Sequence, residues 1–331
     1  MHEVWIIAEV LEGKIKDVSF ELLSRARALA DTLEVRLGSV VLGHHVDPAE
    51  LQKLISYGSD VVYAVEDKRL ASFSCERYAK VLQHLITVHT PQIVIAGATT
   101  MGRTLMPYVA VKTHAGLTAD CTGLGIEERT GNLLQTRPAI GGNIMATIRT
   151  PDHRPQMATV RPRSARPLTP DQKRKGTVVQ VPFDPAWDDR RVEVLGIRRA
   201  DDEQTSIEEA ELVVSGGRGL KKRDNFVLVE QLAKQLGAQV GASRDAVDRG
   251  WARYPHQVGL SGKTISPRLY LALGISGAVQ HLAGIKTAGC IVAINSDEGA
   301  NLLNIADFAI VGDLFAIVPE MMRRLEQRSK S

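Results

Sequence analysis

The residues with the clearest chemical potential lie in glycine-rich turns in the last third of the chain. Residues 215–219, SGGRG, follow an apolar run and precede a helical pattern. Glycines at such a turn let the backbone approach a phosphate, and the amides of a following helix favour an anion. Arg218 adds a charged, fork-shaped donor. The spacing fits neither GxGxxG nor the Walker pattern GxxxxGK(S/T), so the segment predicts an anion site without a nucleotide fingerprint.

Two further segments carry hydroxyl and guanidinium groups. Residues 240–245, VGASRD, follow another apolar run; Ser243 can donate to a phosphate or a carbonyl, and Arg244 can stack on a planar heteroaromatic ring. Residues 256–267 contain glycines and hydroxyls with few large apolar anchors. Ordering such a loop is costly unless it packs against something, and a bound cofactor would provide that contact.

The remaining candidates lie at a predicted helix start and at strand ends. Residues 274–281, GISGAVQH, open a helix with Ser276 near its N-cap, and amides of its first turn suit a pyrophosphate. His281 lies one turn inside that helix. Asn295 and Asp313 each follow an apolar run, at the strand ends where doubly wound sheets bind ligands.

Each segment alone also fits a plain turn, a helix cap or a connecting loop. Their concentration at strand ends and helix starts of one domain favours an extended phosphorylated cofactor, which explains them together. Cys75, Cys121 and Cys290 form no CxxC pair, so zinc and iron–sulfur ligation is not supported. We predict no metal ligands and no catalytic residues.

The elements that must position these residues alternate between strand and helix in the first 115 residues. The predicted strands are 4–10, 40–43, 61–65 and 92–97, and the predicted helices are 20–33, 49–55, 75–88 and 103–112. Such alternation implies right-handed crossovers and a parallel sheet with helices on both faces.

The pattern changes between residues 117 and 200, where turn residues separate short β-like runs. These runs are 124–126, 133–136, 144–148, 157–160, 178–181 and 192–197. We interpret them as antiparallel additions to the first sheet. The stretch 162–176 is rich in Pro, Arg and Lys and predicts an exposed loop.

Strand and helix alternation resumes after a charged run near residues 200–206. The predicted strands are 212–214, 240–242, 290–295 and 308–311, and the predicted helices are 225–236, 278–283 and 314–326. We therefore predict an α/β protein of two doubly wound parallel-sheet domains, residues 1–203 and 204–331, the first with antiparallel β additions.

Composition excludes several other classes of protein. The net charge of +3 over 331 residues gives no reason to expect a nucleic-acid partner or a membrane surface. No run approaches the roughly 20 apolar residues that span a bilayer, and the first residues lack a signal-peptide pattern. With sparse cysteines as well, we expect a cytoplasmic protein without direct membrane insertion.

Motifs along the chain resemble those of electron-transfer flavoprotein alpha subunits. The longest is SPRLYLALGISGAVQHLAGIKTAGCIVAINSDEGANLLNIADFAIVGDLFAIVPE, and SGGRGLK, VGASRDAVDRGW and HQVGLSGKTISP precede it. The first domain contributes AGATTMGRTLMPYVA, GLTADCTGLGIE, TRPAIGGNIMATI and RPQMATVRP. The resemblance covers nearly the whole chain. It implies FAD bound mainly by the second domain, and a first domain that pairs with a beta subunit carrying AMP or a second FAD.

The resemblance also implies the residues that line the FAD. By motif match they are Arg218, Ser243, Arg244, Val258, Gly259, Leu260, Ser261, Ser276, Gly277, Ala278, Val279, Gln280, His281, Asn295, Asp313 and Leu314. Arg244 would lie by the isoalloxazine, Ser261 near its N5 edge, and His281 on the N1/O2 side. Asn295 and Asp313 would face the adenosine half. This chain departs from relatives at residues 260–263, LSGK for QTGK, and at 299–303, GANLL for a segment with APIF.

The implied function is electron transfer from dehydrogenases to a downstream acceptor such as a quinone reductase or an acyl-CoA dehydrogenase-type partner. A cation about 4 Å from a reduced flavin stabilises its negative charge by roughly 4 kcal/mol at an effective dielectric of about 20. This raises the one-electron reduction potential of the flavin by a value on the order of 0.15 V. Arg244 can supply that charge at any physiological pH, whereas His281 must be protonated to do so. The FAD domain would swing about the 200–206 boundary to reach its partners.

Three alternatives stay open on the sequence alone. The loop HQVGLSGKT is similar to the electron-bifurcating branch, in which the complex oxidises NADH and splits electrons between ferredoxin or flavodoxin and a high-potential acceptor. Only in that case would the chain belong to an NADH-oxidising enzyme. From other classes, the chain could be a non-redox adenine-nucleotide-binding protein, or a nicotinamide-dependent dehydrogenase, which the missing GxGxxG disfavours.

Overall fold

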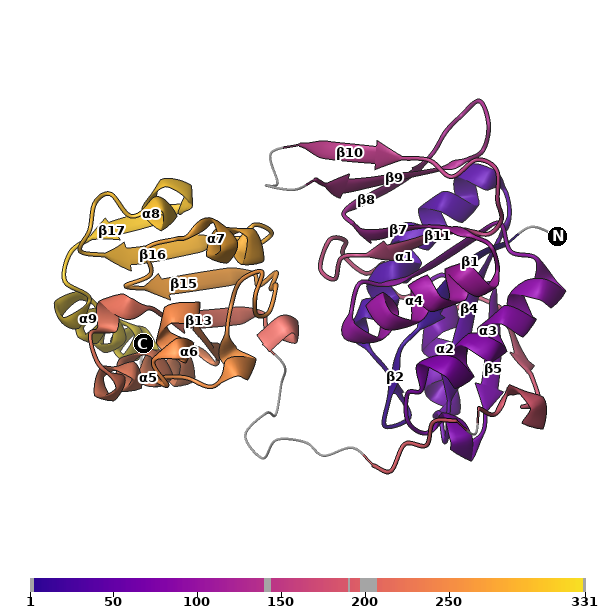
Figure 1. Ribbon diagram of the computed structural model, residues 1–331, viewed down its shortest axis with the longest axis horizontal. Coiled ribbons are helices and arrows are strands. Elements are labelled where there is room, and N and C mark those ends of the chain that lie inside the picture. Colours follow the sequence, from indigo (N-terminus) through magenta and orange to yellow (C-terminus); the bar gives the residue numbers. More distant parts are fainter. Residues whose placement is uncertain (1–2, 140–143, 190, 197–206, 330–331) are drawn as a thin grey trace. The chain divides into compact units, whose positions relative to one another are not determined.

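The computed structural model describes residues 3–139, 144–189, 191–196 and 207–329. The chain divides into two compact units, Met1–Arg198 and Arg199–Ser331. The predicted domain boundary between residues 203 and 204, and the charged run beside it, lie outside the described residues. Figure 1 traces both units by label and by colour, from indigo at the N-terminus to yellow at the C-terminus.

The first unit is built on a seven-stranded sheet in the order β12-β5-β4-β1-β6-β11-β7, in which every neighbouring pair is parallel. The strands are β1 (Glu3–Ala8), β4 (Arg36–Gly43), β5 (Val61–Glu66), β6 (Ile93–Gly97), β7 (Gly116–Cys121), β11 (Gln156–Val160) and β12 (Thr177–Gln180). The helices are α1 (Asp17–Leu33), α2 (Pro48–Ser56), α3 (Cys75–His89) and α4 (Thr100–Lys112). This arrangement confirms the predicted doubly wound α/β class.

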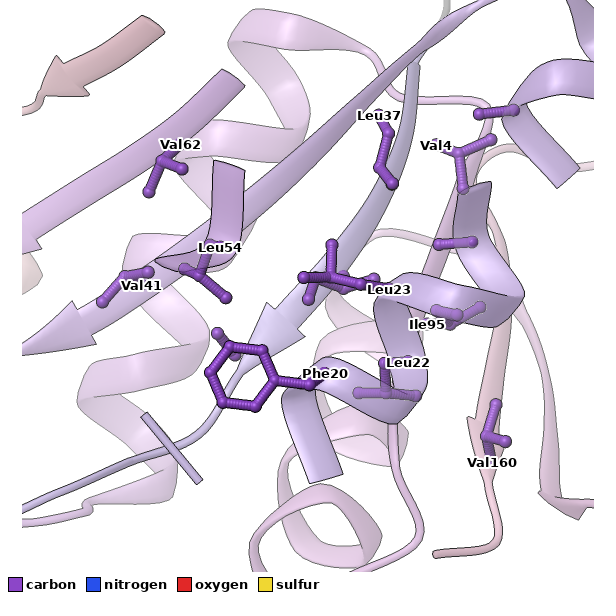
Figure 2. Close-up of a cluster of buried hydrophobic side chains, with 14 of the residues drawn as sticks. Val4, Phe20, Leu22, Leu23, Leu37, Val41, Leu54, Val62, Ile95 and Val160 are labelled. Atoms are coloured by element: carbon purple, nitrogen blue, oxygen red, sulfur yellow. The ribbon is translucent and has the colours of Figure 1, made fainter. Parts of the chain in front are cut away.

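Two apolar clusters hold the helices on opposite faces of this sheet. Val4 and Ile6 of β1 share a buried cluster with α1 and α2, whereas Trp5 and Ile7 share one with α3 and α4. The alternation follows from the two-residue repeat of side-chain direction along a strand. Figure 2 shows part of the first cluster, in which Phe20, Leu22 and Leu23 of α1 share the apolar interior with strand residues such as Val41 and Ile95.

Three of the predicted runs are antiparallel strands, but they form a separate small sheet and do not join the first one: β8 (Gly123–Ile126), β9 (Leu133–Pro138) and β10 (Met145–Ile148). A second small antiparallel sheet, β2 (Val10–Leu11) with β3 (Lys14–Ile15), was not predicted. The antiparallel direction was wrong for two other runs. β11 and β12 join the main sheet as parallel strands, β11 between β6 and β7 and β12 beside β5.

The physical reason differs between these two strands. β11 is buried along its whole length, as expected of an interior parallel strand that has helices on both faces. β12 is mostly exposed and lies at an edge, so its direction depends on chain routing rather than on residue pattern. The predicted run 192–197 contains no strand over 192–196, and residue 197 lies outside the described residues.

The second unit contains a five-stranded parallel sheet in the order β14-β13-β15-β16-β17. The strands are β13 (Leu212–Gly216), β14 (Gln239–Ala242), β15 (Leu269–Leu273), β16 (Ile291–Asn295) and β17 (Phe308–Val311), and the helices are α5 (Val227–Leu236), α6 (Arg244–Asp248), α7 (Val279–Ile285), α8 (Asn301–Ile305) and α9 (Leu314–Ser329). Residues of α5 and α9 share one core cluster, and those of α7 and α8 share another.

The central strand β15 was missed from the sequence, as were the short helices α6 and α8. Its position matters because successive strands are laid down on opposite sides of β13, first β14 and then β15. The connections therefore leave β13 and β15 toward opposite faces of the sheet. Ligands of doubly wound sheets bind in the crevice that forms at such a switch point.

None of the helices within the described ranges has the length and apolarity needed to cross a membrane.

The core of the first unit gives a stability prediction. Leu23 on α1 is fully buried, so Leu23→Ala removes apolar contacts and leaves a cavity. We expect the free energy of unfolding to fall by about 2–5 kcal/mol. The matched control is Leu11→Ala, because the Leu11 side chain is half-exposed, and we expect a change within about 0.5 kcal/mol. Denaturant unfolding followed by circular dichroism measures both, and equal losses would contradict the assigned core.

Candidate functional site

A pocket of about 780 Å³ lies at the carboxyl edge of the second sheet, where β13, β14, β15 and β16 end. Every residue predicted for the site lines it except Val279, Asp313 and Leu314. The lining residues are Arg218, Gly219, Ser243, Arg244, Asp245, Asp248, Val258, Gly259, Leu260, Ser261, Gly274, Ile275, Ser276, Gly277, Ala278, Gln280, His281, Asn295 and Asp297. Its size lies within the roughly 300–1,000 Å³ that small-molecule sites occupy.

The turns that follow β13 and β15 touch each other through their backbones. The N–H of Gly219 donates to the carbonyl of Gly274 at 2.9 Å. A Cβ atom on Gly219 would lie 2.6 Å from the Cα of Gly274, closer than real contacts allow. Gly274 itself has φ +63°, a left-handed conformation that glycine adopts without strain. Only glycine therefore permits this approach of the two turns.

The turn continues into α7 by pressing against α8. Gly277 has φ +82°, and a Cβ there would lie 2.5 Å from the backbone nitrogen of Leu302. The N–H of Leu302 donates to the carbonyl of Ser276 at 3.2 Å. α7 begins at Val279 with Ala278 as its N-cap, so Ser276 lies before the cap and not at it. Since no side chain caps α7, none occludes its first turn.

The loop between α6 and β15 is held by the protein itself. The N–H of Leu260 donates to the carbonyl of Gln280 on α7 at 2.9 Å, and that of Val258 donates to the carbonyl of Ala242 at 2.9 Å. A bound cofactor was expected to supply the packing contact for this loop, whereas in the structure α7 supplies one. Gln257 donates its Nε2–H to the Oγ of Ser261 at 3.0 Å, which leaves the Ser261 proton available to the pocket.

The positive charge in the pocket comes from arginines at its rim. Arg244 lies 3.4 Å from Asp248, and their side chains are 70% and 63% exposed. An exposed pair of this length contributes little free energy, so Arg244 can be redirected by a ligand. Ser243 caps α6 by accepting from the N–H of Ala246 at 3.4 Å. Arg218 is exposed at the opposite turn, after β13.

His281 is the only buried histidine that lines the pocket, among the residues that the structure describes. Its Nε2 lies 2.8 Å from the hydroxyl of Tyr270, and its Nδ1 has no hydrogen-bond partner among the described residues. Burial lowers the pKa of His281 to about 4, although the backbone of Val258 favours the charged ring. The imidazole is therefore neutral near pH 7. Of the two groups considered for a cation beside the ligand, Arg244 fits and His281 does not.

The side chain of Asn295 forms hydrogen bonds with nearby backbone groups. Its Nδ2–H donates to the carbonyl of Ile275 at 3.0 Å, and its Oδ1 accepts from the N–H of Asp297 at 3.1 Å. It thus ties the turn after β15 to the end of β16. Both polar groups of the Asn295 side chain are thus used by the protein. Its position beside the adenosine half of the ligand stays a prediction.

The three predicted residues outside the pocket have other positions. Asp313 accepts from the N–H of Phe315 at 3.0 Å, at the start of α9. Leu314 belongs to the core under α5 and α9, and the Val279 side chain is exposed. Their contacts with a ligand stay predictions.

Several lining residues were not singled out from the sequence. They are Gly219, Asp245, Asp248, Gly274, Ile275 and Asp297. All but Asp248 stand inside the glycine-rich and strand-end segments already recognised. The signal for Asp248 is its spacing of four residues from Arg244, which places both on one face of a helix.

This arrangement fits an elongated ligand with phosphates and a planar polar ring. The glycine turns form a cradle that any Cβ would fill, the arginines supply positive charge, and His281 presents an orphaned buried nitrogen. FAD has all the required features. No cluster of potential metal ligands occurs within the described ranges.

Comparisons with known proteins agree with these chemical features. The family model of the electron transfer flavoprotein domain matches residues 4–186, and that of the electron transfer flavoprotein FAD-binding domain matches residues 206–286. An electron transfer flavoprotein subunit alpha from Thermoanaerobacterium thermosaccharolyticum is 46% identical over 98% of each chain. A protein FixB from Clostridium saccharobutylicum is 43% identical over 98% of this chain and 96% of its own. An acryloyl-CoA reductase electron transfer subunit beta from Anaerotignum propionicum is 37% identical over 98% and 96%.

The glycine turn before α7 gives a binding prediction. Gly277→Ala adds a Cβ against Leu302 and strains a positive φ, so we expect the turn to shift and FAD affinity to fall at least tenfold. The control is Gly237→Ala at the end of α5, where φ is +63° but the Cβ would meet open space. That variant carries the same kind of backbone strain without the clash. Flavin fluorescence titration of the flavin-stripped chain with its partner subunit measures both, and equal affinities would contradict the role of the Gly277 contact.

The buried histidine gives a pH prediction. The pKa of His281 falls from an unfolded value of 6.5 to about 4 on folding, so the unfolded chain binds the extra proton between these values. Keeping His281 neutral therefore contributes to the free energy of unfolding above pH 6.5. This contribution, at most about 3 kcal/mol, is lost as the pH falls toward 4. We expect the flavin-free wild type to lose that much more stability than His281→Gln over this range. Urea unfolding at each pH tests this, and parallel pH profiles would contradict a depressed pKa.

Proposed function

The chain belongs to the electron transfer flavoprotein alpha-subunit family, and from this premise we propose that the pocket of the second unit is where its FAD binds. The observation that carries the proposal is the meeting of glycine turns, arginines and the orphaned His281 nitrogen at the switch point of one sheet. When bound, FAD supplies one- and two-electron redox chemistry, and the protein contributes binding, orientation and electrostatics.

The chain's own groups divide this work. The turns at Gly219, Gly274 and Gly277 let backbone amides reach the phosphates, with Arg218 beside them. Arg244 places a fixed positive charge at the rim, and Ser261 offers its hydroxyl proton to a ring nitrogen.

The electron-transfer role is that of the family, and alpha subunits of this family pair with a beta subunit. We propose that the first unit makes this contact. We further propose that the donors are dehydrogenases and that the acceptor is a quinone reductase or an acyl-CoA dehydrogenase-type protein. Support for the second class comes from the relative named as an acryloyl-CoA reductase subunit. A cytoplasmic location also stays a prediction.

Electron bifurcation is a second candidate, favoured by the HQVGLSGKT loop. The two candidates differ in the number of flavins and in reactivity. We therefore propose to purify the chain with its beta subunit and to measure FAD per heterodimer and the rate of NADH oxidation. One FAD and no reaction with NADH supports the simple carrier, and two FAD with NADH oxidation supports bifurcation. A colourless complex that refuses FAD contradicts both.

The rim cation gives a redox prediction. Arg244→Ala removes a positive charge that favours electron uptake by the flavin, so we expect weaker FAD binding and a first reduction potential lower by tens of millivolts. A shift of about 0.15 V would require a cation and a flavin that are both shielded from solvent. Solvent screens the charge of Arg244 at the rim, so the expected shift in potential is smaller.

Two variants serve as controls for this measurement. Arg244→Lys keeps the charge without the planar fork, so we expect it to recover most of the potential but not the affinity. Arg249→Ala removes an exposed arginine that pairs with Asp245 and does not line the pocket, so we expect no change. Spectroelectrochemical titration measures all three, and an unchanged potential in Arg244→Ala would contradict its assigned role.

A further inference from the structure

Tyr270 is a fully buried side chain that none of the roles above uses. It stands on β15, in the middle of the second sheet, and does not line the pocket. Its hydroxyl nevertheless reaches a residue that does, since it lies 2.8 Å from Nε2 of His281. A phenol at the centre of a doubly wound sheet needs a hydrogen-bond partner, because an unpaired buried hydroxyl costs about 1–3 kcal/mol. His281 provides such a partner, and the hydroxyl of Ser215 also interacts with the phenol.

The number of protons shared by Tyr270 and His281 favours one tautomer of the imidazole. Burial raises the pKa of Tyr270, so the phenol keeps its single proton. The phenol lies 2.8 Å from Nε2 of His281, and the hydroxyl of Ser215 on β13 also interacts with it. If the phenol donates to Nε2, the neutral imidazole must carry its own proton on Nδ1.

The opposite tautomer sets two acceptors against each other. If Nε2–H donated to the phenol oxygen, the phenol proton could pass to the hydroxyl of Ser215, whose contact with Tyr270 lowers the pKa of the phenol. Nδ1 would then be unprotonated beside the backbone of Val258, which favours the protonated ring. The charged imidazolium, which would donate from both nitrogens, is disfavoured because the ring is 6% exposed.

We propose that Tyr270 is a positioning residue that holds His281 with its proton on Nδ1, as a neutral donor to the bound flavin. The proposal rests on the function assigned to this pocket. Nδ1 is buried and unpartnered within the described residues, and its residue lines the pocket. The backbone of Val258 lies near this ring but forms no hydrogen bond with Nδ1, so a donor held there can serve a ring oxygen or nitrogen that gains negative charge on reduction. The tyrosine thus acts on the flavin through the tautomer that it imposes.

The tautomer can be measured without flavin. In the flavin-stripped heterodimer labelled with 15N-histidine, we expect wild-type His281 to carry its proton on Nδ1. Tyr270→Phe removes the donor and keeps the ring volume, so we expect the proton to move toward Nε2. A wild-type His281 protonated on Nε2, or a variant spectrum identical to the wild type, overturns the proposal.

A double-mutant cycle separates positioning from simple packing. We expect Tyr270→Phe to raise the FAD dissociation constant about tenfold, and to lower the first reduction potential. In the His281→Gln background the same substitution should change affinity less than twofold, because the residue it acts through is gone. An equal loss in both backgrounds would mean that Tyr270 acts by packing alone, which overturns the proposal.

The control for losing a buried phenol is Tyr78→Phe in the core of the first unit. The Tyr78 hydroxyl donates to the carbonyl of Leu70 at 3.0 Å and has no contact with the pocket. We expect less than a twofold change in FAD affinity, and a tenfold loss there would overturn the assignment to Tyr270. If the wild-type complex binds no FAD, the proposed function fails, whereas the tautomer measurement still decides the role of Tyr270.

Discussion

The site depends on one contact, the approach of the glycine turns that follow β13 and β15. The hydrogen bond from Gly219 to Gly274 joins them at a spacing that any Cβ would prevent. The chain leaves these two strands toward opposite faces of the sheet, so the crevice between the turns stays open. Loop 257–263 is tied to α7 by a backbone hydrogen bond, and the Asn295 side chain at the end of β16 donates to the turn after β15.

The electrostatics of the pocket follow from where its ionisable groups lie. Arginines stand at the exposed rim, where solvation keeps them charged and where a weak pair with Asp248 leaves Arg244 available. Histidine lies in the buried interior, where burial lowers its pKa to about 4. The interior therefore holds a neutral imidazole and the rim holds the cations, so the site buries no unpaired ion.

Local pattern predicted the class of the fold and the segments that line the pocket, whereas the family resemblance implied the individual residues. Turns and strand ends after apolar runs marked Arg218, Ser243 and Asn295, because doubly wound topology brings the ends of the strands together. The direction of β12 could not be predicted, because an exposed edge strand carries no residue pattern that distinguishes parallel from antiparallel pairing. Tyr270 was also missed, since its apolar neighbours hide a polar contact formed only when β15 and α7 pack together.

The most direct test of the account is hydrogen exchange in the heterodimer with and without FAD, read by mass spectrometry at peptide resolution. The account predicts that FAD protects the amides of three segments in the second unit, residues 217–220, 258–263 and 275–281. These segments form the turns and the loop around the pocket. Protection confined to the first unit, or absent from these three segments, would contradict the assignment of the flavin to this site.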